Sequence, residues 1–315
     1  MLKRKNVMTV IISLTLISAM AISAFAISSI VKEKNIFQLA SENGIDIANV
    51  DDEENFKYTK FDLNKMDATK VDLSDSSSKV EIYSDPKVDI YNKMLNTIDY
   101  FNSISLTMET SMLGDEITTV EYQTNIDSGL SYQSVDEGDG VITETYSEDN
   151  NMIYVDNTAR TYTENYLPTY TRADTPYMNL NKRIVTGEDG IPCYYYRRNV
   201  TNCPLASYSI VPQEITFSYL KDFDKWTIED DAVEYLGRNC VKIVGTPSPY
   251  IATKHNIDSF TMIVDTTTGI LMKYEGSLGG DISRYMTVTE CSFESRVAVK
   301  QFNIDDYSTY KAETR

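Results

Sequence analysis

The sequence predicts a mainly β fold that also contains a few helices. Short segments such as "SISLTMETSML" and "SFTMIVDTTTGILMKYEG" alternate apolar and polar residues, and polar turn residues separate them. One segment near the start, "SDPKVDIYNKMLNTIDYF", repeats apolar residues at helical spacing instead. Two runs of about five strands flank an irregular insertion at 167–211. Because many strands keep one polar face, this order fits a two-layer sandwich or a single curved antiparallel sheet plugged by helices.

The first residues predict export across a membrane. Residues 1–6 (MLKRKN) are basic, and residues 7–31 carry no charge before Lys32 ends the run. An uncharged run of this length can span a bilayer, which favours an uncleaved signal anchor with a transmembrane helix at 7–31. The triplet Ala24-Phe25-Ala26 fits a signal peptidase site instead, and favours secretion after cleavage near Ala26. Both interpretations keep the basic end inside the cell and export the rest of the chain.

A polar spacer at 35–84 is expected between the signal segment at 1–34 and the folded domain. Its central part, "VDDEENFKYTKFDLNKMDATKVDLSDSSSK", has many charges and few large apolar residues. The whole chain of 315 residues has 29 Lys and Arg against 47 Asp and Glu, a formal charge of −18. Such an acidic surface repels phosphate backbones, which argues against nucleic acid as a partner. It also repels an anionic membrane unless a tether holds the protein there.

The folded domain is expected to begin with a helix. Asp85 is placed to cap this helix, and Pro86 suits its first position. Its apolar face comprises Tyr91, Met94, Leu95, Ile98 and Phe101. Strands are then expected in "SISLTMETSML", "ITTVEYQTNI", "GLSYQS", "GVITETYS", "NMIYVD" and "RTYTEN". The breaks between them are rich in Gly, Asp, Asn and Ser, so consecutive strands form an antiparallel meander.

After the insertion, a helix is expected in "VPQEITFSYLKDF", with Pro212 at its start. Strands resume in "KWTIEDD" and "AVEYLGRNCVKIVGT", with a kink or turn at Gly237, and a flexible connection follows at 246–259. The hairpin "SFTMIVDTTTGILMKYEG" turns at Gly269, which can adopt a positive φ, and "RYMTVTECSFES" finishes the sheet. The domain is therefore expected to span 85–303, followed by a C-terminal tail at 304–315.

Two parts of the chain carry a resemblance to a known family. In the first, the helix runs straight into "FNSISLTMET", and "NNMIYVDNTARTYTE" follows further on. In the second, "WTIEDDAVEYLGRNCVKIVGT" precedes "FTMIVDTTTGILMKYEG", and its most specific residues are Leu236-Gly237-Arg238, Val264-Asp265 and Thr268-Gly269-Ile270-Leu271. Over residues 87–303 the chain resembles the LolA-like superfamily of exported bacterial proteins. This superfamily includes the lipoprotein carrier LolA and the sigma-regulatory RseB and MucB proteins.

The resemblance implies a fold and a class of function. The implied fold is a half-barrel, a single curved antiparallel sheet of about 10–11 strands with helices in its concave face. In this chain the hydrophobic helix expected at 7–31 precedes it, and such an anchor departs from a freely diffusing carrier. The implied function is non-enzymatic binding of a lipid, acyl chain or lipoprotein in the concave apolar face. The alternative is a regulatory protein that binds an extracytoplasmic segment of an anti-sigma type regulator, or a cell-wall or sporulation enzyme. Both stay open, because a fold does not fix a function.

Five apolar side chains are the candidates for the wall that would face an apolar ligand. They are Leu106, Met108, Met262, Val264 and Met272. Methionine is unbranched and adaptable, which suits a variable apolar ligand. The same alternation is equally typical of an ordinary closed core, so that interpretation stays open as well.

Arginines and cysteines supply further candidates. Arg197 and Arg198 follow three tyrosines in "YYYRR" and are expected to contact an anionic headgroup or a partner's carboxylates. All four cysteines follow the signal segment, and export permits disulfides. Cys193 and Cys203 lie ten residues apart in a polar, irregular stretch and are the candidate pair. The other two, Cys240 and Cys291, lie in apolar-alternating strands and are expected to be buried free thiols.

No catalytic residue, metal site or cofactor is expected. The single histidine, His255, lies in the flexible connection as a solvated residue, and no G-x-S-x-G elbow accompanies it. The cysteines lack a C-x-x-C pair, one histidine cannot complete a usual zinc set, and no twelve-residue calcium loop or Gly-rich phosphate loop occurs. A two-carboxylate glycosidase stays a minor alternative, because 47 acidic residues neither support nor exclude it.

Overall fold

The structure, a computed structural model, describes residues 68–73, 79–112, 117–186, 192–293 and 297–313. All of them belong to the second of the two units into which the chain divides, Lys57–Arg315. The expected membrane span at 7–31 and the cleavage site near Ala26 lie outside the described residues. Within the described residues, no helix has both the length and the apolar character needed to cross a bilayer.

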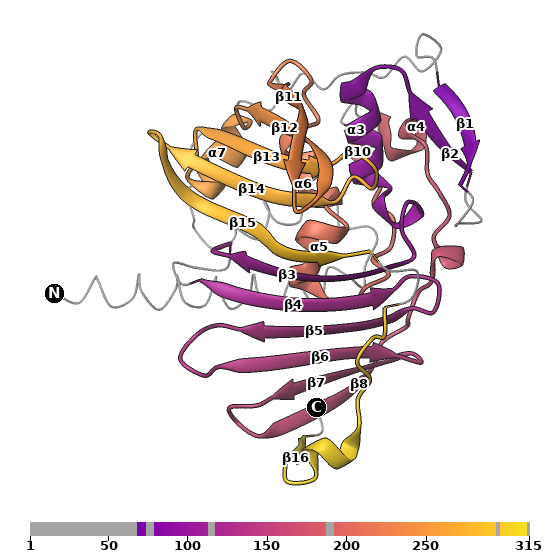
Figure 1. The fold of residues 1–315 in the computed structure, drawn as a ribbon, viewed down its shortest axis with the longest axis vertical. Helices are drawn as coiled ribbons and strands as arrows, with labels where there is room; N and C mark the ends of the chain where they lie inside the picture. Colours follow the sequence, from indigo (N-terminus) through magenta and orange to yellow (C-terminus); the bar gives the residue numbers. More distant parts are fainter. Residues whose placement is uncertain (1–67, 74–78, 113–116, 187–191, 294–296, 314–315) are drawn as a thin grey trace, which may run out of the picture. The chain divides into compact units, whose positions relative to one another are not determined.

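One twelve-stranded sheet forms the frame of this unit (Figure 1). Its strand order is β11-β12-β13-β14-β15-β3-β4-β5-β6-β7-β8-β16. The bounds are β3 Ser103–Thr110, β4 Thr118–Asn125, β5 Leu130–Asp136, β6 Ile142–Glu148, β7 Asn151–Asp156, β8 Thr161–Tyr166, β11 Trp226–Tyr235, β12 Arg238–Gly245, β13 Ser259–Asp265, β14 Leu271–Leu278, β15 Asp281–Ser292 and β16 Lys311–Glu313. The single open sheet confirms the mainly β, curved antiparallel fold and shows that the sandwich interpretation is wrong.

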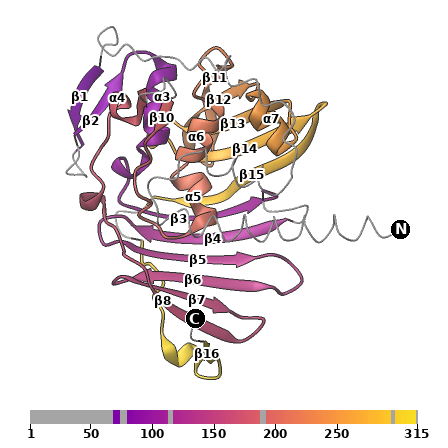
Figure 2. The same cartoon turned by 180° about the vertical axis from the view of Figure 1, so that it is seen from behind.

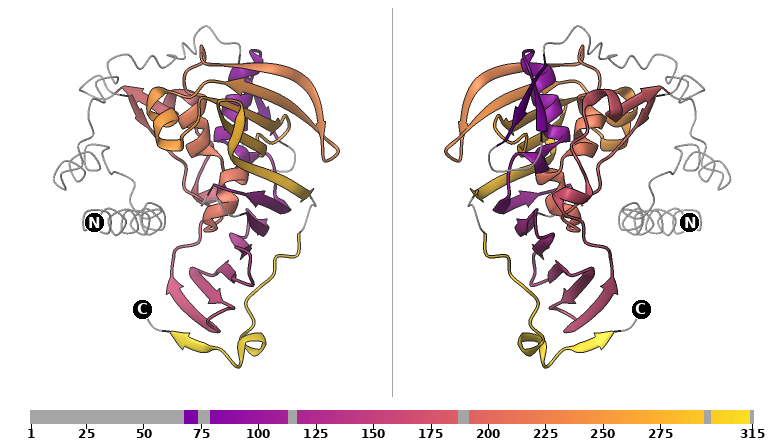
Figure 3. Two further views of the ribbon diagram at one scale, coloured as in Figure 1. Left: turned by 90° about the vertical axis from the view of Figure 1, so that its left-hand side faces the viewer. Right: turned by 90° about the vertical axis from the view of Figure 1, so that its right-hand side faces the viewer.

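Neighbouring strands of the sheet pair antiparallel, as in the expected meander, except that β16 pairs parallel with β8. The sheet is curved, and helices α5 (Pro204–Ile210) and α6 (Gln213–Tyr219) lie on its concave side (Figures 2 and 3). Helix α5 contacts β14 and β4, and α6 contacts helix α3 (Pro86–Leu95). The helices therefore fill the space that the curvature of the sheet creates.

Helix α3 begins as the sequence predicts. The side chain of Asp85 accepts hydrogen bonds from the backbone N–H groups of Lys87 and Val88, and Pro86 occupies the first helical turn. The helix ends at Leu95, earlier than the apolar spacing suggests, and a 3₁₀ turn η3 (Thr97–Asp99) follows. Asn96, Thr97 and Asp99 have low helix propensity, which explains the early end.

The hairpin between β13 and β14 shows why its turn is so well specified. The buried carboxylate of Asp265 accepts hydrogen bonds from the backbone N–H groups of Thr267 and Thr268 and from the guanidinium of Arg238. Gly269 has a φ of +76°, and a Cβ there would lie 2.6 Å from the carbonyl oxygen of Lys93. The turn therefore packs backbone to backbone against the end of α3. Its residues thus stabilise the frame of the sheet.

Several segments that the sequence left irregular contain regular structure. The insertion at 167–211 holds η4 (Arg172–Asp174), α4 (Leu180–Arg183), a hairpin of β9 (Ile184–Thr186) and β10 (Pro192–Tyr194), and α5. The connection at 246–259 contains helix α7 (Pro249–His255), so the expectation of a flexible link is wrong. The hydroxyl of Ser248 caps α7 and Asn256 ends it in a left-handed conformation, both ordinary helix signals. Because α7 fully buries only Ile251, it lacks the apolar periodicity that would reveal it.

The structure also differs from the expectation at both ends of the domain. Part of the expected spacer forms a two-stranded antiparallel sheet of β1 (Ala68–Asp72) and β2 (Lys79–Tyr83). Val80 and Tyr83 of β2 are buried, and Asn92 of α3 donates to the Glu81 carbonyl, so tertiary contacts order a segment of weak propensity. Part of the expected tail forms a 3₁₀ turn η5 (Ile304–Tyr307) and strand β16.

The buried apolar residues form two cores on opposite faces of the sheet. The larger core lies between the concave face and helices α3, α5 and α6. The smaller core lies on the convex face of β5–β8, under the C-terminal segment, and consists of Tyr132, Tyr146, Ile153, Val155 and Tyr307. One core thus lies inside the curve of the sheet and the other outside it.

Candidate functional site

The five apolar candidates lie together in the larger core. Leu106 and Met108 come from β3, Met262 and Val264 from β13, and Met272 from β14. Each is at most 2% exposed. The structure therefore brings together all the side chains expected to share one wall, and it covers them.

Further methionines lie in the same core. Met286 of β15 joins Met108, Met262 and Met272 on the sheet, Met94 comes from helix α3, and all five are fully buried. Thioether side chains adapt to irregular neighbours at low energetic cost, because they have three freely rotating bonds and no branch. Such a wall can repack around different apolar shapes.

Helix α5 packs over the concave face with small and large side chains. Its fully buried residues are Ala206, Ser209 and Ile210, and Leu205 and Tyr208 pack partly buried against the same core. Polar contacts also hold it in place: the Ser209 hydroxyl donates to the Leu271 carbonyl at 2.9 Å, and the Ala206 N–H donates to Oε1 of Gln133 at 3.1 Å. Apolar burial and a few hydrogen bonds together hold α5 over the core.

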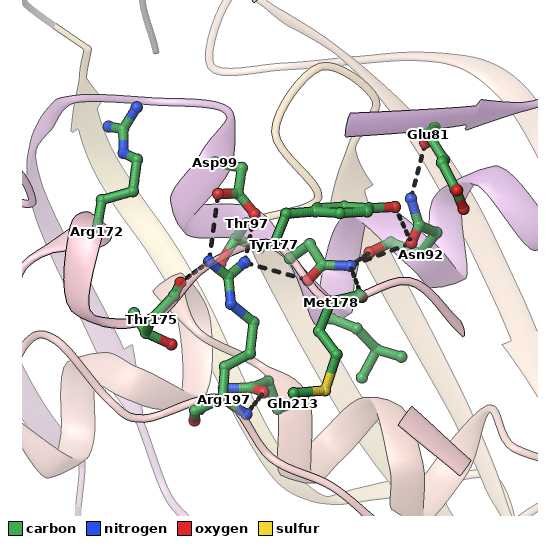
Figure 4. A network of polar contacts seen from close by, with 12 residues as sticks. Glu81, Asn92, Thr97, Asp99, Arg172, Thr175, Tyr177, Met178, Arg197 and Gln213 are labelled. Atoms are coloured by element: carbon green, nitrogen blue, oxygen red, sulfur yellow. Dashed lines mark hydrogen bonds and ion pairs between the residues drawn. The ribbon is translucent and has the colours of Figure 1, made fainter. Parts of the chain in front are cut away.

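A buried ion pair ties the insertion to the end of α3 (Figure 4). The guanidinium of Arg197 contacts both carboxylate oxygens of Asp99, and the side chains are at most 1% exposed. Arg197 also donates to Oδ1 of Asn96 at 3.1 Å and to the Thr175 carbonyl. The pair therefore anchors the chain just before α5 to the turn just after α3.

A second arginine completes this network. Arg183, fully buried, donates to Oε1 of Gln213 at 2.7 Å, to the Tyr195 carbonyl at 2.8 Å and to the Leu95 carbonyl. Burial, together with the neighbouring charge of Arg197, lowers the pKa of Arg183 to about 9. Gln213 also accepts from the backbone N–H of Arg197, so α6 and both arginines form one connected unit.

The structure places Arg197 and Arg198, the two residues expected to contact a headgroup, in different environments. Arg197 is buried in its ion pair, so the expectation that it contacts an external anion is wrong in this conformation. Arg198 is exposed instead and lies over the ring of Tyr170, 4.7 Å from the ring centroid. The sequence could not show that Asp99, far away along the chain, neutralises one arginine of the pair.

The cysteines are all free thiols in the structure. Cys193 is exposed on β10, whereas Cys203 is fully buried at the start of α5, so the expected disulfide between them is absent. Cys240 is buried, as expected, and Cys291 is partly buried.

His255 is not the solvated residue that the sequence suggested. Its ring is partly buried, and Nδ1 lies 3.1 Å from the Tyr219 hydroxyl, which lies 2.7 Å from the Tyr274 hydroxyl. Burial, together with the cations Arg284 and Lys254, lowers the pKa of His255 to about 4. These neighbours hold the ring of His255 in a packed, neutral state. Among the described residues, no three His, Cys, Asp or Glu side chains lie close enough together to hold a metal ion.

The convex face holds a polar cluster that the sequence did not reveal. The carboxylate of Glu144 accepts hydrogen bonds from the hydroxyls of Tyr132, Tyr146 and Tyr307 and from the amide of Asn157. The ammonium group of Lys300 lies 2.7 Å from the same carboxylate. Two of these partners are in the C-terminal segment, more than 150 residues from Glu144, and no local motif marks them.

Glu144 should make the stability of the protein depend on acid pH. Burial alone would raise its pKa, but the hydrogen bonds from Lys300, Asn157, Tyr307 and Tyr132 outweigh burial and lower the pKa to about 2. The folded pKa lies below the ordinary value of 4.5, so the stabilisation is complete above pH 4.5 and is lost as the pH falls towards 2. We expect at most about 3 kcal/mol of unfolding free energy to disappear over this range.

Urea denaturation at several pH values checks this expectation. The wild type should lose more stability between pH 5 and pH 2.5 than Glu144→Gln, which cannot titrate at this position. Equal losses in both proteins would show that the carboxylate of Glu144 does not carry the acid sensitivity.

Comparisons with known proteins give structural matches only. No protein-family model and no curated protein matches the chain. A chain of the MucA–MucB complex of Pseudomonas aeruginosa matches at 15% identity and a TM-score of 0.36, over 70% of this chain and 60% of that chain. LppX, a lipoprotein of Mycobacterium tuberculosis, matches at 12% identity and a TM-score of 0.35, over 69% of this chain and 100% of that chain.

A putative outer membrane lipoprotein-sorting domain from Vibrio parahaemolyticus matches at 8% identity and a TM-score of 0.25, over 70% of this chain and 96% of that chain. The chain is thus similar in structure to these proteins at low sequence identity. At such identities and TM-scores they say nothing about a ligand or a partner, which must follow from the residues of this chain.

Proposed function

We propose that this protein is an extracytoplasmic, non-enzymatic binding protein that holds a lipid, an acyl chain or the acylated end of a lipoprotein against its concave face. The observation that carries this proposal is a core on the concave face that contains five buried methionines and lies under the short helix α5. The apolar run at 7–31 would hold the domain at the membrane from which such a ligand comes.

The buried side chains of α5 set the cost of moving it. Ile210 is its one large apolar residue that is fully buried, and exposing one such side chain costs about 1.5–3 kcal/mol. The partly buried Leu205 and Tyr208 add to this cost, whereas Ala206 and Ser209 add little apolar area. An acyl chain that takes the place of α5 would offset part of this cost, because methylene groups can pack against the same wall.

The polar end of such a ligand would lie near the insertion. Arg198 precedes α5 by a few residues and is exposed, so its guanidinium is available for a phosphate or carboxylate. The ion pair of Arg197 with Asp99 would keep the insertion attached to α3 while α5 moves. The alternative function, binding an extracytoplasmic segment of a membrane regulator or an envelope enzyme, requires a surface site rather than this interior.

Ser209→Ala tests whether α5 is the cover. The change removes the hydroxyl that donates to the Leu271 carbonyl, which lowers the stability of the closed form by about 1 kcal/mol. The closed form does not bind the ligand, so apparent affinity for a ligand rises as the closed fraction falls. We therefore expect the variant to bind an environment-sensitive fluorescent fatty acid about fivefold more tightly than the wild type. A fluorescence titration of both proteins measures this change.

Ser308→Ala serves as the matched control, because Ser308 is exposed and lies on the C-terminal segment far from α5. Its affinity for the probe should equal that of the wild type. Probe binding that is unchanged in Ser209→Ala, or equally raised in the control, would contradict the role of α5.

A further inference from the structure

The C-terminal segment, residues 297–313, lies across the convex face of the sheet; we call it the strap. Figure 3 shows it on the side of the sheet away from α5 and α6. It starts over β4, where the Lys300 N–H donates to Oε1 of Gln123, and it ends as β16 beside β8. The strap thus covers the aromatic face of β5–β8 without contributing to the methionine wall.

The strap places one ammonium group in a cage on this face. Nζ of Lys300 lies 2.7 Å from Oε1 of Glu144 and 3.2 Å from the hydroxyl of Tyr132. It also lies over the ring of Tyr132 at 4.7 Å and over the ring of Tyr146 at 5.7 Å from the centroids. A carboxylate flanked by the faces of electron-rich rings is the arrangement that attracts an ammonium ion.

The cage suits a single ammonium better than a guanidinium. Oε1 of Glu144 accepts from Tyr132, Tyr146 and Lys300, and Oε2 accepts from Asn157 at 3.0 Å and from Tyr307 at 2.7 Å. Arginine binds a carboxylate best through both oxygens at once, whereas lysine needs only one. An ammonium at Oε1 therefore leaves the donors of Oε2 in place, whereas a bidentate guanidinium would compete with them.

Most of this recognition set belongs to the sheet and would persist without the strap. Tyr132, Tyr146 and Asn157 already donate to Glu144 from β5, β6 and the turn after β7. The strap adds Lys300 and the Tyr307 hydroxyl, and the ring of Phe302 packs against Tyr146 and Tyr162. A segment from elsewhere that offers a lysine and an aromatic residue two positions later would meet the same partners.

The strap is anchored in its middle and exposed at its end. Tyr307 is buried and Val299, Phe302 and Tyr310 pack against the smaller core, whereas the three residues of β16 that pair with β8 are all exposed. Local opening of the strap would therefore start at β16. The protein as a whole carries a charge of −18, which favours basic partner segments over acidic ones.

We propose that the convex face of β5–β8 is a recognition site for an extended, lysine-bearing segment of a partner protein, and that the strap occupies this site in cis through Lys300. The Glu144 carboxylate and the rings of Tyr132 and Tyr146 bind the ammonium group, and the face of Tyr162 receives the aromatic residue that follows. This site is independent of the acyl-binding interior on the other side of the sheet.

The first test removes the strap and returns it as a peptide. The chain truncated after residue 296 is titrated with a fluorescent peptide of residues 297–313, and anisotropy reports binding. We expect the Lys300→Ala peptide to bind at least tenfold more weakly and the Lys300→Arg peptide to be weakened as well. The Lys311→Ala peptide is the matched control, because Lys311 lies on exposed β16, and its affinity should stay within twofold. Equal binding of the Lys300→Ala peptide would overturn the proposal.

The second test keeps the strap and the full chain. Lys300→Ala leaves the anchors Phe302 and Tyr307 in place and empties the ammonium position. We expect n-butylammonium chloride to raise the Tm of this variant by several degrees relative to sodium chloride at equal ionic strength. It should raise neither the Tm of the wild type nor that of Lys300→Ala combined with Glu144→Gln. No rise in Lys300→Ala would overturn the proposal even if the truncated chain fails to fold.

The same experiments distinguish a partner protein from a second copy of this chain. We expect the full chain to be a monomer by size-exclusion chromatography with light scattering. A dimer that dissociates in Lys300→Ala would mean that straps exchange between copies, which would overturn the assignment to a different protein.

Discussion

Arg197→Met is expected to lower the free energy of unfolding by about 3–5 kcal/mol, because it leaves the buried carboxylate of Asp99 without its cation. The methionine fills much of the volume of the arginine stem, so the loss reports the charge rather than a cavity. Chemical denaturation of the variant and the wild type measures this difference.

A double variant separates the charge from the fold. Arg197→Met combined with Asp99→Leu removes both charges, and we expect it to be more stable than Arg197→Met alone. Buried ion pairs often add little net stability, so the double variant should recover a large part of the loss. A double variant that is less stable than either single change would show that the side chains act through packing instead.

Gly269→Ala is expected to lower the free energy of unfolding by about as much as Arg197→Met does. The new Cβ would lie 2.6 Å from the Lys93 carbonyl oxygen and equally close to the Met94 nitrogen, and backbone atoms cannot move aside as a side chain can. The positive φ of Gly269 adds a further penalty for any L-residue. Together these effects should lower the free energy of unfolding by about 3–5 kcal/mol.

Gly237→Ala provides the control for Gly269→Ala. Gly237 has a φ of +72°, nearly the same as that of Gly269, but a Cβ there would meet no atom within 4 Å. We expect a loss of only about 1–2 kcal/mol at Gly237, from the backbone conformation alone. Equal losses at both positions would contradict the close contact between the turn and α3.

The sequence predicts the frame because local patterns decide it. Alternating residues in "SISLTMETSML" and "SFTMIVDTTTGILMKYEG", separated by turn residues, identify the strands, and Asp85 with Pro86 identifies the start of α3. The five candidates for the apolar wall also emerge from this alternation, and the structure places them in one core. The alternation does not show which face of the sheet is covered, or which element covers it.

The contacts that were missed join residues far apart in the chain. The pairing of Arg197 with Asp99 and that of Lys300 with Glu144 each bridge about 100 residues or more, and no spacing rule links such positions. Helix α7 and the β1–β2 hairpin were missed for a different reason: they bury few residues, so their order depends on tertiary contacts rather than on periodicity.

Native mass spectrometry of the full chain, purified from the cell envelope in a mild detergent, tests the central claim most directly. We expect extra mass that matches a lipid or an acyl chain, that disappears on delipidation and returns when fatty acid is added. Substituting Met272 by a charged residue, in a variant shown to be folded, should prevent the mass from returning. A chain that carries no extra mass, and that gains none with added lipid even in Ser209→Ala, would contradict binding at the concave face.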